Sequence, residues 1–255
     1  MPTEGLYGLY HIIYIFLSYF LIAIGLVLTT LHPLREKTRF WFLKILGGIL
    51  LILLVINRIT VIKWYVDNNC GYRWIHVIPN TWCSVATLVL SLSLLLSKKE
   101  NIFYHFCIYL NIYGGIFNTL LPTYLNDQGF FEVRTFSSLL YHSLAFFVAL
   151  FLFLQKYIHP SFRKSLAFPI GMAIIMLIGY FQKFVMHYPL AMQVKEPFVD
   201  HGPYHYITAW YVVIPAGSLL VVFLNYCYEK FVLKRTNEAI FRLKNKAGDI
   251  DGAID

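Results

Sequence analysis

The residues with the most evident reactivity are a cysteine and a histidine in two different apolar stretches, Cys83 and His142. Cysteine and histidine form a nucleophile–base pair: the imidazole accepts the thiol proton, and the thiolate attacks an ester or acyl carbonyl. Asn80, Asn118 and Tyr141 carry groups that are suited to polarise that carbonyl. These residue types favour acyl transfer, although a cysteine in an apolar stretch is more often a small packing residue.

Two cations lie at the ends of apolar stretches, Arg58 and Lys183. A guanidinium or an ammonium group at that place is suited to the phosphate of a lipid headgroup, or it extends to the interface without any ligand. Three histidines are expected at the same end of the molecule and are supporting polar candidates: His76, His187 and His205.

Histidine-bound zinc is the alternative chemistry. His201 and His205 form an HxxxH pair, which could be completed by another histidine from the same end. Gly202 and Pro203 lie between the two and interrupt the helix that would align them. We therefore expect no metal and no other cofactor.

These residues must be positioned by membrane-spanning helices. Of the 255 residues, 58% are hydrophobic and 13% are charged, against roughly 45–50% and about 25% in soluble domains. Stretches of about 20 apolar residues are long enough to cross a bilayer as helices. Seven stretches qualify: 8–31, 40–62, 74–97, 103–125, 136–157, 166–187 and 204–230. We predict an all-α bundle over residues 1–230 and a polar cytoplasmic tail over 231–255.

The positive charge indicates an orientation. The net charge is +8, and 14 of the 21 Lys and Arg residues lie in the tail or in the loops after the first, third and fifth stretches. The positive-inside rule then places the N-terminus outside and the C-terminus in the cytoplasm. The basic residues form short clusters beside apolar stretches and do not form a continuous basic face, so we expect lipid headgroups and not nucleic acid as partners.

With this orientation, the polar residues of the apolar stretches gather in the outer half of the bundle, and several share a helical face. Helical spacing groups them as His76, Asn80 and Cys83; Asn111, Asn118 and Pro122; and Ser138 and His142. Polar stripes on helices in lipid are expected to face inward. No Asp or Glu falls inside a predicted span, which weighs against an ion-coupled transporter.

Several short motifs resemble a known family. They are Ile78-Pro79-Asn80-Thr81-Trp82-Cys83-Ser84, Tyr113-Gly114-Gly115, Asn118-Thr119-Leu120-Leu121-Pro122, Tyr141-His142-Ser143-Leu144 and Gly202-Pro203-Tyr204. In this order, over residues 55–220, the chain resembles the YwaF-like bacterial membrane proteins and the related transmembrane protein 164 family. The resemblance implies a seven-span lipid acyltransferase whose catalytic pair is Cys83 and His142. The family pattern has a histidine two residues before the cysteine, where this chain has Thr81.

We therefore predict an enzyme that moves a fatty acyl chain between phospholipids and lysophospholipids near the outer or lumenal leaflet. The alternatives are a lipid hydrolase, which uses the Cys–His pair or zinc, and a non-enzymatic permease or subunit of a membrane complex. The expected location is a bacterial cytoplasmic membrane, with an internal eukaryotic membrane as the alternative. The oligomeric state stays open.

Overall fold

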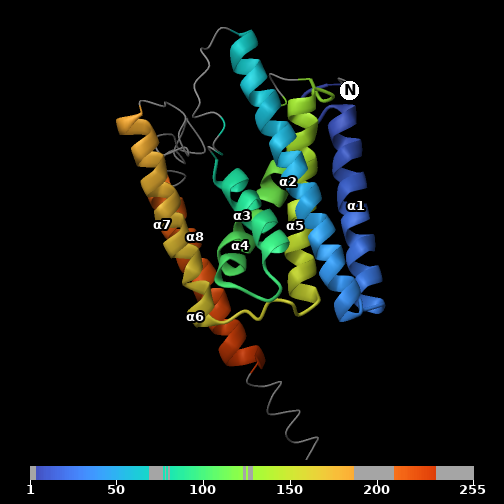
Figure 1. Cartoon of the computed structure of the whole chain (residues 1–255), viewed down its shortest axis with the longest axis vertical. Coiled ribbons are helices and arrows are strands. Elements are labelled where there is room, and N and C mark those ends of the chain that lie inside the picture. Colours follow the sequence, from blue (N-terminus) through green and yellow to red (C-terminus); the bar gives the residue numbers. More distant parts are fainter. Residues whose placement is uncertain are drawn as a thin grey trace, which may run out of the picture.

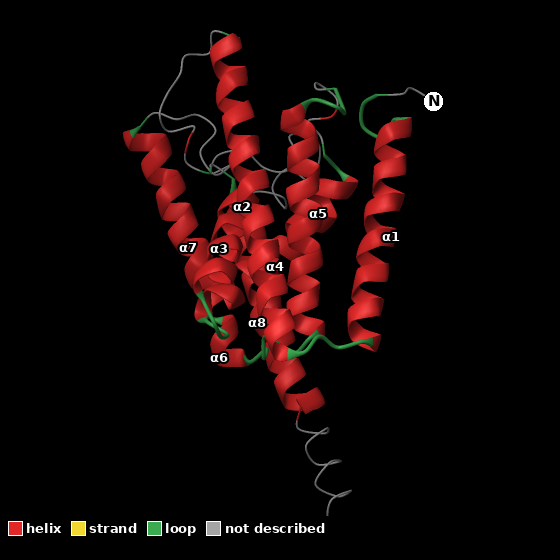
Figure 2. Cartoon of the chain, turned by 45° about the vertical axis from the view of Figure 1, so that its right-hand side comes forward, coloured by secondary structure: helices red, strands yellow, loops and turns green. Residues whose placement is uncertain are grey.

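A computed structural model describes residues 4–68, 77, 79, 81–122, 125, 129–186 and 210–233, and the regular elements among them are all helical (Figures 1 and 2). The prediction of an all-α fold is confirmed. The helices are α1 (Leu9–Leu31), α2 (Glu36–Asp67), α3 (Trp82–Leu96), α4 (Ile102–Leu120), α5 (Val133–Leu154), α6 (Phe162–Ser165), α7 (Ala167–Tyr180) with the π-helix η3 (Phe181–Val185), and α8 (Trp210–Cys227) with the π-helix η5 (Tyr228–Leu233).

Five helical stretches of the described chain are long and apolar enough to cross a membrane: α1, α2, α5, Phe162–Tyr180 and Ile214–Leu233. Their outward side chains are large and apolar. On α1, for example, Phe16 is 74% exposed and Phe20 is 63% exposed. Surfaces of this kind need a hydrocarbon solvent, because water would not tolerate so large an apolar area.

The upper end of the bundle in Figure 1 is where α1 and α5 begin and where α2 and α4 end. The lower end is where α3 and α5 end and where α2 and α4 begin. We use these two names below. That the upper end faces outside remains a prediction from the charge distribution.

The third helix is much shorter than predicted. The apolar stretch 74–97 was expected to be helical throughout, but α3 begins only at Trp82. Thr81 has extended backbone angles (φ −126°, ψ 152°) and caps the helix. Cys83 is therefore the second residue of α3, and the predicted helical face of His76, Asn80 and Cys83 falls partly outside the described residues. His76 and Asn80 themselves lie outside the described residues.

Other boundaries moved for simple reasons. Helix α4 ends at Leu120, not at 125, because Pro122 cannot donate to a continuing helix.

Helices α2 and α3 differ greatly in length. At 1.5 Å per residue, α2 is about 48 Å long and α3 only about 22 Å, against about 30 Å of bilayer hydrocarbon. Figure 1 shows α3 beginning well below the upper end of α2. The N-terminus of α3 therefore opens inside the bundle.

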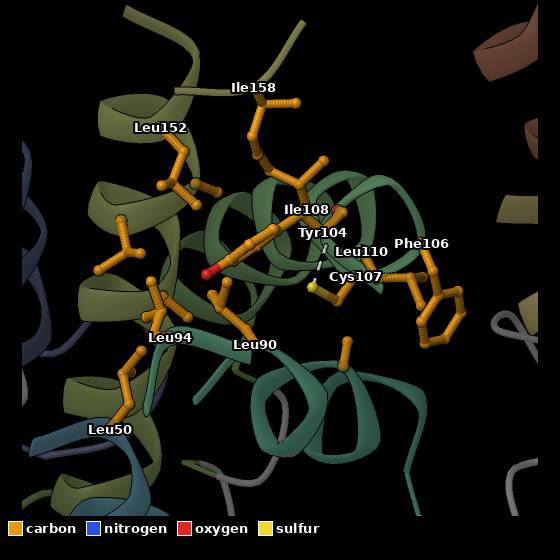
Figure 3. Close-up of a cluster of buried hydrophobic side chains, with 14 of the residues drawn as sticks. Leu50, Leu90, Leu94, Tyr104, Phe106, Cys107, Ile108, Leu110, Leu152 and Ile158 are labelled. Atoms are coloured by element: carbon orange, nitrogen blue, oxygen red, sulfur yellow. Dashed lines mark hydrogen bonds between the residues drawn. The ribbon is translucent and has the colours of Figure 1, made fainter. Parts of the chain in front are cut away.

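Helices α2, α3, α4 and α5 form the centre of the molecule, with α1 on one side and α7 and α8 on the other (Figure 1). The apolar core between these four helices is shown in Figure 3. Leu50 of α2, Leu90 of α3, Ile108 of α4 and Leu152 of α5 are all fully buried there. The buried hydroxyl of Tyr104 donates to the backbone carbonyl of Ser93 (3.0 Å), which ties α4 to α3.

Candidate functional site

Gly114 of α4 brings Cys83 and His142 to one point. A Cβ atom placed on Gly114 would lie 2.8 Å from Sγ of Cys83 and 3.6 Å from Nδ1 of His142. The thiol of α3 and the imidazole of α5 therefore face the same small space, which exists because residue 114 has no side chain. His142 is buried (3% exposed), and Cys83 is half-buried. Within the described part of the chain, neither side chain makes a hydrogen bond to another residue.

The next residue sets the distance between α4 and α5. A Cβ atom on Gly115 would lie 2.3 Å from Cβ of Phe146 and 3.2 Å from the carbonyl oxygen of His142. Such contacts are too short for any side chain, so only glycine allows this crossing. Small residues that let two backbones approach are typical of helix packing in membranes. Gly114 and Gly115 together allow His142 to pack against α4. This role was not predicted from the sequence.

Cys83 is the second residue of α3, at the positive end of the helix dipole. The first-turn N–H groups of a helix have no intrahelical acceptors, and they stabilise negative charge on a nearby sulfur or oxygen. A capping box fixes this turn: Thr81 Oγ1 accepts from the Ser84 N–H, and Ser84 Oγ accepts from the Thr81 N–H, both at 3.3 Å. Thr81 therefore caps the helix that carries Cys83, at the position where the family pattern has histidine.

Tyr141 and Arg58 extend the site toward the upper end. The rings of Tyr141 and His142 have centroids 4.3 Å apart, and Tyr141 is buried. Tyr141 also lies within electrostatic range of Arg58 and Cys83. Of the two cations predicted to bind a headgroup, Arg58 is thus the one whose charge acts on Tyr141, the neighbour of His142.

Asn57 holds Arg58 in place and adds a cation that the sequence analysis missed. Arg58 donates to Asn57 Oδ1 (3.2 Å), and Asn57 Nδ2 donates to the Arg134 carbonyl (2.9 Å) and to Ser137 Oγ (3.3 Å). The guanidinium of Arg134 stacks over Trp64 at 4.5 Å from the ring centroid. Arg134 lies at the start of α5, and nothing in its own segment distinguishes it from other loop cations. Only the folded structure brings it beside α2.

Of the remaining predicted site residues, Asn118 and Lys183 lie on described helices and the others do not. Asn118 is half-buried on α4, and Lys183 belongs to η3, where its side chain is outside the description. His187 and His205 lie outside the described residues, as do His76 and Asn80. Within the described ranges, no group of three or more His, Cys, Asp or Glu side chains could hold a metal ion.

Asn111 of the predicted α4 stripe has a structural role instead. Its Oδ1 atom accepts from Thr87 Oγ1 of α3 (2.9 Å), and its Nδ2 atom donates to the Cys107 carbonyl (2.8 Å). This buried amide joins α3 to α4 about one helical turn from Gly114. Asn111 therefore faces inward as predicted, and it uses its polar atoms within the protein.

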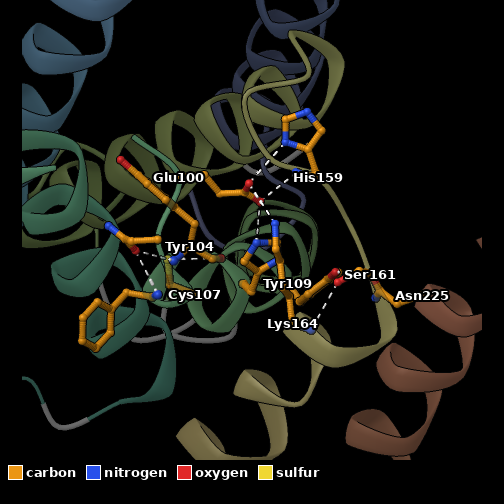
Figure 4. A network of polar contacts seen from close by, with 11 residues as sticks. Glu100, Tyr104, Cys107, Tyr109, His159, Ser161, Lys164 and Asn225 are labelled. Atoms are coloured by element: carbon orange, nitrogen blue, oxygen red, sulfur yellow. Dashed lines mark hydrogen bonds and ion pairs between the residues drawn. The ribbon is translucent and has the colours of Figure 1, made fainter. Parts of the chain in front are cut away.

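A second polar cluster lies at the lower end, around Glu100 in the loop between α3 and α4 (Figure 4). Its carboxylate accepts from His105 Nε2 (2.7 Å), the His159 N–H (2.8 Å), His159 Nδ1 (3.2 Å) and Lys164 Nζ (2.9 Å). Burial by itself would raise the pKa of Glu100, but these donors lower it to about 2. The carboxylate is thus a fixed anion that joins two loops to α4 and α6.

The long apolar helices, the four-helix core and the polar groups inside it define a polytopic α-helical integral membrane protein. The sequence model of the TMEM164 family matches residues 6–227, and the chain belongs to this family. The suspected family is thereby confirmed. No curated protein and no solved structure matches the chain.

Proposed function

We propose that the protein is a lipid acyltransferase in which Cys83 is the nucleophile and His142 is the general base. One observation carries the proposal: a single point on Gly114 lies in contact range of both the thiol sulfur and Nδ1 of the imidazole. Nucleophile and base need this kind of proximity, and a reactive pair in a structure without substrate is often looser than in the reacting complex.

In the first half-reaction, His142 takes the thiol proton and the Cys83 sulfur attacks the ester carbonyl of a phospholipid. The tetrahedral oxyanion forms beside the first turn of α3, where the backbone N–H of Cys83 and the hydroxyl of Tyr141 are the candidate donors. The carbon–oxygen ester bond then breaks. The leaving lysophospholipid oxygen takes the proton from His142, and the acyl chain remains on Cys83 as a thioester.

In the second half-reaction, a lysophospholipid is the acceptor. His142 removes the proton from its hydroxyl group, and the resulting oxygen attacks the thioester carbonyl. The carbon–sulfur bond breaks, the sulfur recovers the proton, and a new phospholipid leaves. No cofactor or oxidant is needed, because each step moves only an acyl group and a proton.

The position of the pair suits a lipid ester. Cys83 lies in the first turn of α3, and Arg58 lies on α2 with its charge within electrostatic range of Tyr141. A phosphate at the upper end would meet Arg58, while the ester groups of the same lipid would extend toward Cys83. With the orientation expected from the positive charges, this is the outer or lumenal leaflet.

The test is intact-mass spectrometry of the purified protein after incubation with phospholipid in nanodiscs. We expect a hydroxylamine-sensitive acyl adduct on the wild type, no adduct on Cys83→Ala, and the normal adduct on the matched control Cys227→Ala. Adding lysophospholipid should remove the adduct and yield phospholipid that carries the transferred chain.

Two other outcomes contradict the transferase. Free fatty acid as the end product, with lysophospholipid acceptor present, would make the protein a hydrolase that uses the same pair. No adduct on the wild type, together with unchanged lipids, would return Cys83 to a packing role and favour a permease or a membrane-complex subunit.

A further inference from the structure

Helix α1 is held to the bundle by polar contacts at both of its ends. Near the upper end, His11 Nε2 donates to the Thr119 carbonyl (2.9 Å). Near the lower end, Gln155 Nε2 donates to the Thr29 carbonyl (2.6 Å). Between these contacts Tyr14 of α1 and Ser143 of α5 also share a hydrogen bond (2.7 Å), and Gly25 of α1 packs against the ring of Phe147.

The space between the two helices is a groove of about 540 Å³. It is lined from Tyr10 to Gly25 on α1, and from Phe130 to Phe147 on α5 and the turn before it. At 1.5 Å per residue, the α1 side of the groove is about 22 Å long. We call it the α1–α5 groove.

The groove offers almost no polar atom to a ligand. Tyr14 donates to or accepts from Ser143 Oγ at 2.7 Å, and Ser18 donates to the Ile15 carbonyl at 3.1 Å. The rest of the lining between these residues is apolar. A group that needs hydrogen bonds would lose them on entering, so the chemistry of the lining selects hydrocarbon.

The upper mouth of the groove is aromatic. Tyr10 packs edge-on against Phe131, with ring centroids 4.8 Å apart, and Phe130 lies behind them at 6.1 Å from Tyr10. Aromatic groups of this kind are typical of the headgroup level of a membrane. At the opposite end, Gly25 lies against the Phe147 ring and leaves the deep part of the groove open.

We propose that the α1–α5 groove binds one acyl chain of a membrane phospholipid, with the headgroup at the aromatic mouth. The lining selects this occupant, because it offers almost no hydrogen-bonding atom and a hydrocarbon chain needs none. Such chains come from the surrounding bilayer. The inference does not require acyl transfer, because the groove lies on the α1 side of α5 and neither Cys83 nor His142 lines it.

The test uses Cys83→Ala protein in nanodiscs, with a phospholipid that carries a photoreactive diazirine near the end of one acyl chain. We expect crosslinks to concentrate on the peptides that contain residues 10–25 and 130–147, and unlabelled phospholipid should compete for them. Leu17→Trp fills the groove and should lower the crosslinks about tenfold. The neighbouring Phe16→Trp is the control, since Phe16 faces away from the groove and is 74% exposed, and it should leave the yield unchanged.

Crosslinks spread evenly over all lipid-facing helices and insensitive to Leu17→Trp would mean ordinary lipid contact only, and would overturn the proposal. Failure of this inference is separable from failure of the acyltransferase, because the crosslink is measured without the nucleophile. A wild-type thioester adduct with unlocalised crosslinks rejects the groove alone, and localised crosslinks without any adduct reject the transferase alone.

Discussion

The two ends of the four central helices each bury a histidine, and the two histidines have opposite surroundings. At the lower end, His105 of α4 donates to the Glu100 carboxylate, which is also bound by His159 and Lys164. At the upper end, His142 of α5 faces the Cys83 sulfur across Gly114 and has no hydrogen bond within the described structure. Both rings are almost fully buried, at 1% and 3% exposure.

The cluster around Glu100 stabilises the fold, whereas Cys83 and His142 form the proposed reactive site. Buried polar groups are normally hydrogen-bonded, because an unmet bond costs about 1–3 kcal/mol. The Glu100 carboxylate follows this rule, since four donors bind it and fix its loops, whereas the buried Nδ1 atom of His105 has no hydrogen bond within the described structure. At the proposed reactive site, neither Cys83 nor His142 makes a side-chain hydrogen bond to another residue within the described structure, and a nucleophile and its base need such positions to bind a reactant. The following predictions test this contrast.

The largest effect is expected from replacing each histidine by glutamine. His142→Gln removes the base and should lower thioester formation by about 10²–10⁴-fold, the usual contribution of general acid–base catalysis. His105→Gln should leave thioester formation unchanged and lower the melting temperature. Mass spectrometry and thermal unfolding of both variants measure the two effects. Equal loss of activity in both variants would show that the two ends are not functionally distinct.

The next effect concerns stability and pH at the lower end. The pKa of Glu100 is about 2 in the fold and 4.5 in the unfolded chain, so its stabilising effect is complete above pH 4.5 and is lost as the pH falls toward 2. We expect unfolding in detergent to become about 2 kcal/mol easier over this range, allowing for the partly solvated site.

The variant Glu100→Gln provides the control for that measurement. Without the titrating carboxylate, the variant should be less stable at pH 7 and should lose the stability change between pH 4.5 and 2. The same pH dependence in wild type and variant would assign it to another group. Thioester formation at pH 7 should survive the substitution.

A smaller effect is expected at the point where the thiol and the imidazole meet. In Gly114→Ala, the added methyl group would lie 2.8 Å from Sγ of Cys83, so the sulfur must move. We expect thioester formation to fall about tenfold with normal folding, because small misplacements of reacting groups are costly. Gly48→Ala on α2 is the matched control, since nothing lies within 4 Å of its added methyl group. An unaffected Gly114→Ala enzyme would contradict the proposed site.

The smallest effect should come from the helix cap. Thr81→Val removes the oxygen that accepts from the Ser84 N–H, and losing such a cap costs about 1 kcal/mol. We expect a loss of a few fold in thioester formation, because the cap fixes the turn that holds Cys83. Thr81→Ser keeps the oxygen and should behave as wild type. Normal activity in Thr81→Val would limit the cap to a role in stability.

Much of the fold could be predicted, because lipid imposes simple rules on a chain. The all-helical fold, the long apolar helices and the family were predicted correctly, whereas five of the seven predicted spans are long and apolar enough to cross a membrane in the described structure. The clearest error arose because a local helix cap overrides hydropathy. The stretch 74–97 is mostly apolar, yet the capping box of Thr81 and Ser84 starts α3 only at Trp82. Hydropathy measures preference for lipid and does not detect where a helix begins.

The candidate site was predicted in part. Cys83, His142 and Tyr141 were chosen from their types and the motifs, and the structure brings these three close together. Arg134 and the role of Gly114 were missed, since neither is unusual in its own segment. Their importance comes from contacts between helices that are far apart in the sequence, and such contacts depend on packing.

By itself, the sequence determined that this chain is helical and lies in a membrane, because backbone groups in lipid must be satisfied within each helix. The motifs also determined the family. Only the tertiary structure decided that the cysteine of α3 and the histidine of α5 meet over a glycine of α4, and that α1 leaves a groove beside α5. The physical reason is that two helices come close only where small residues such as glycine lie at their crossing. The hydropathy of a sequence does not show where two helices cross.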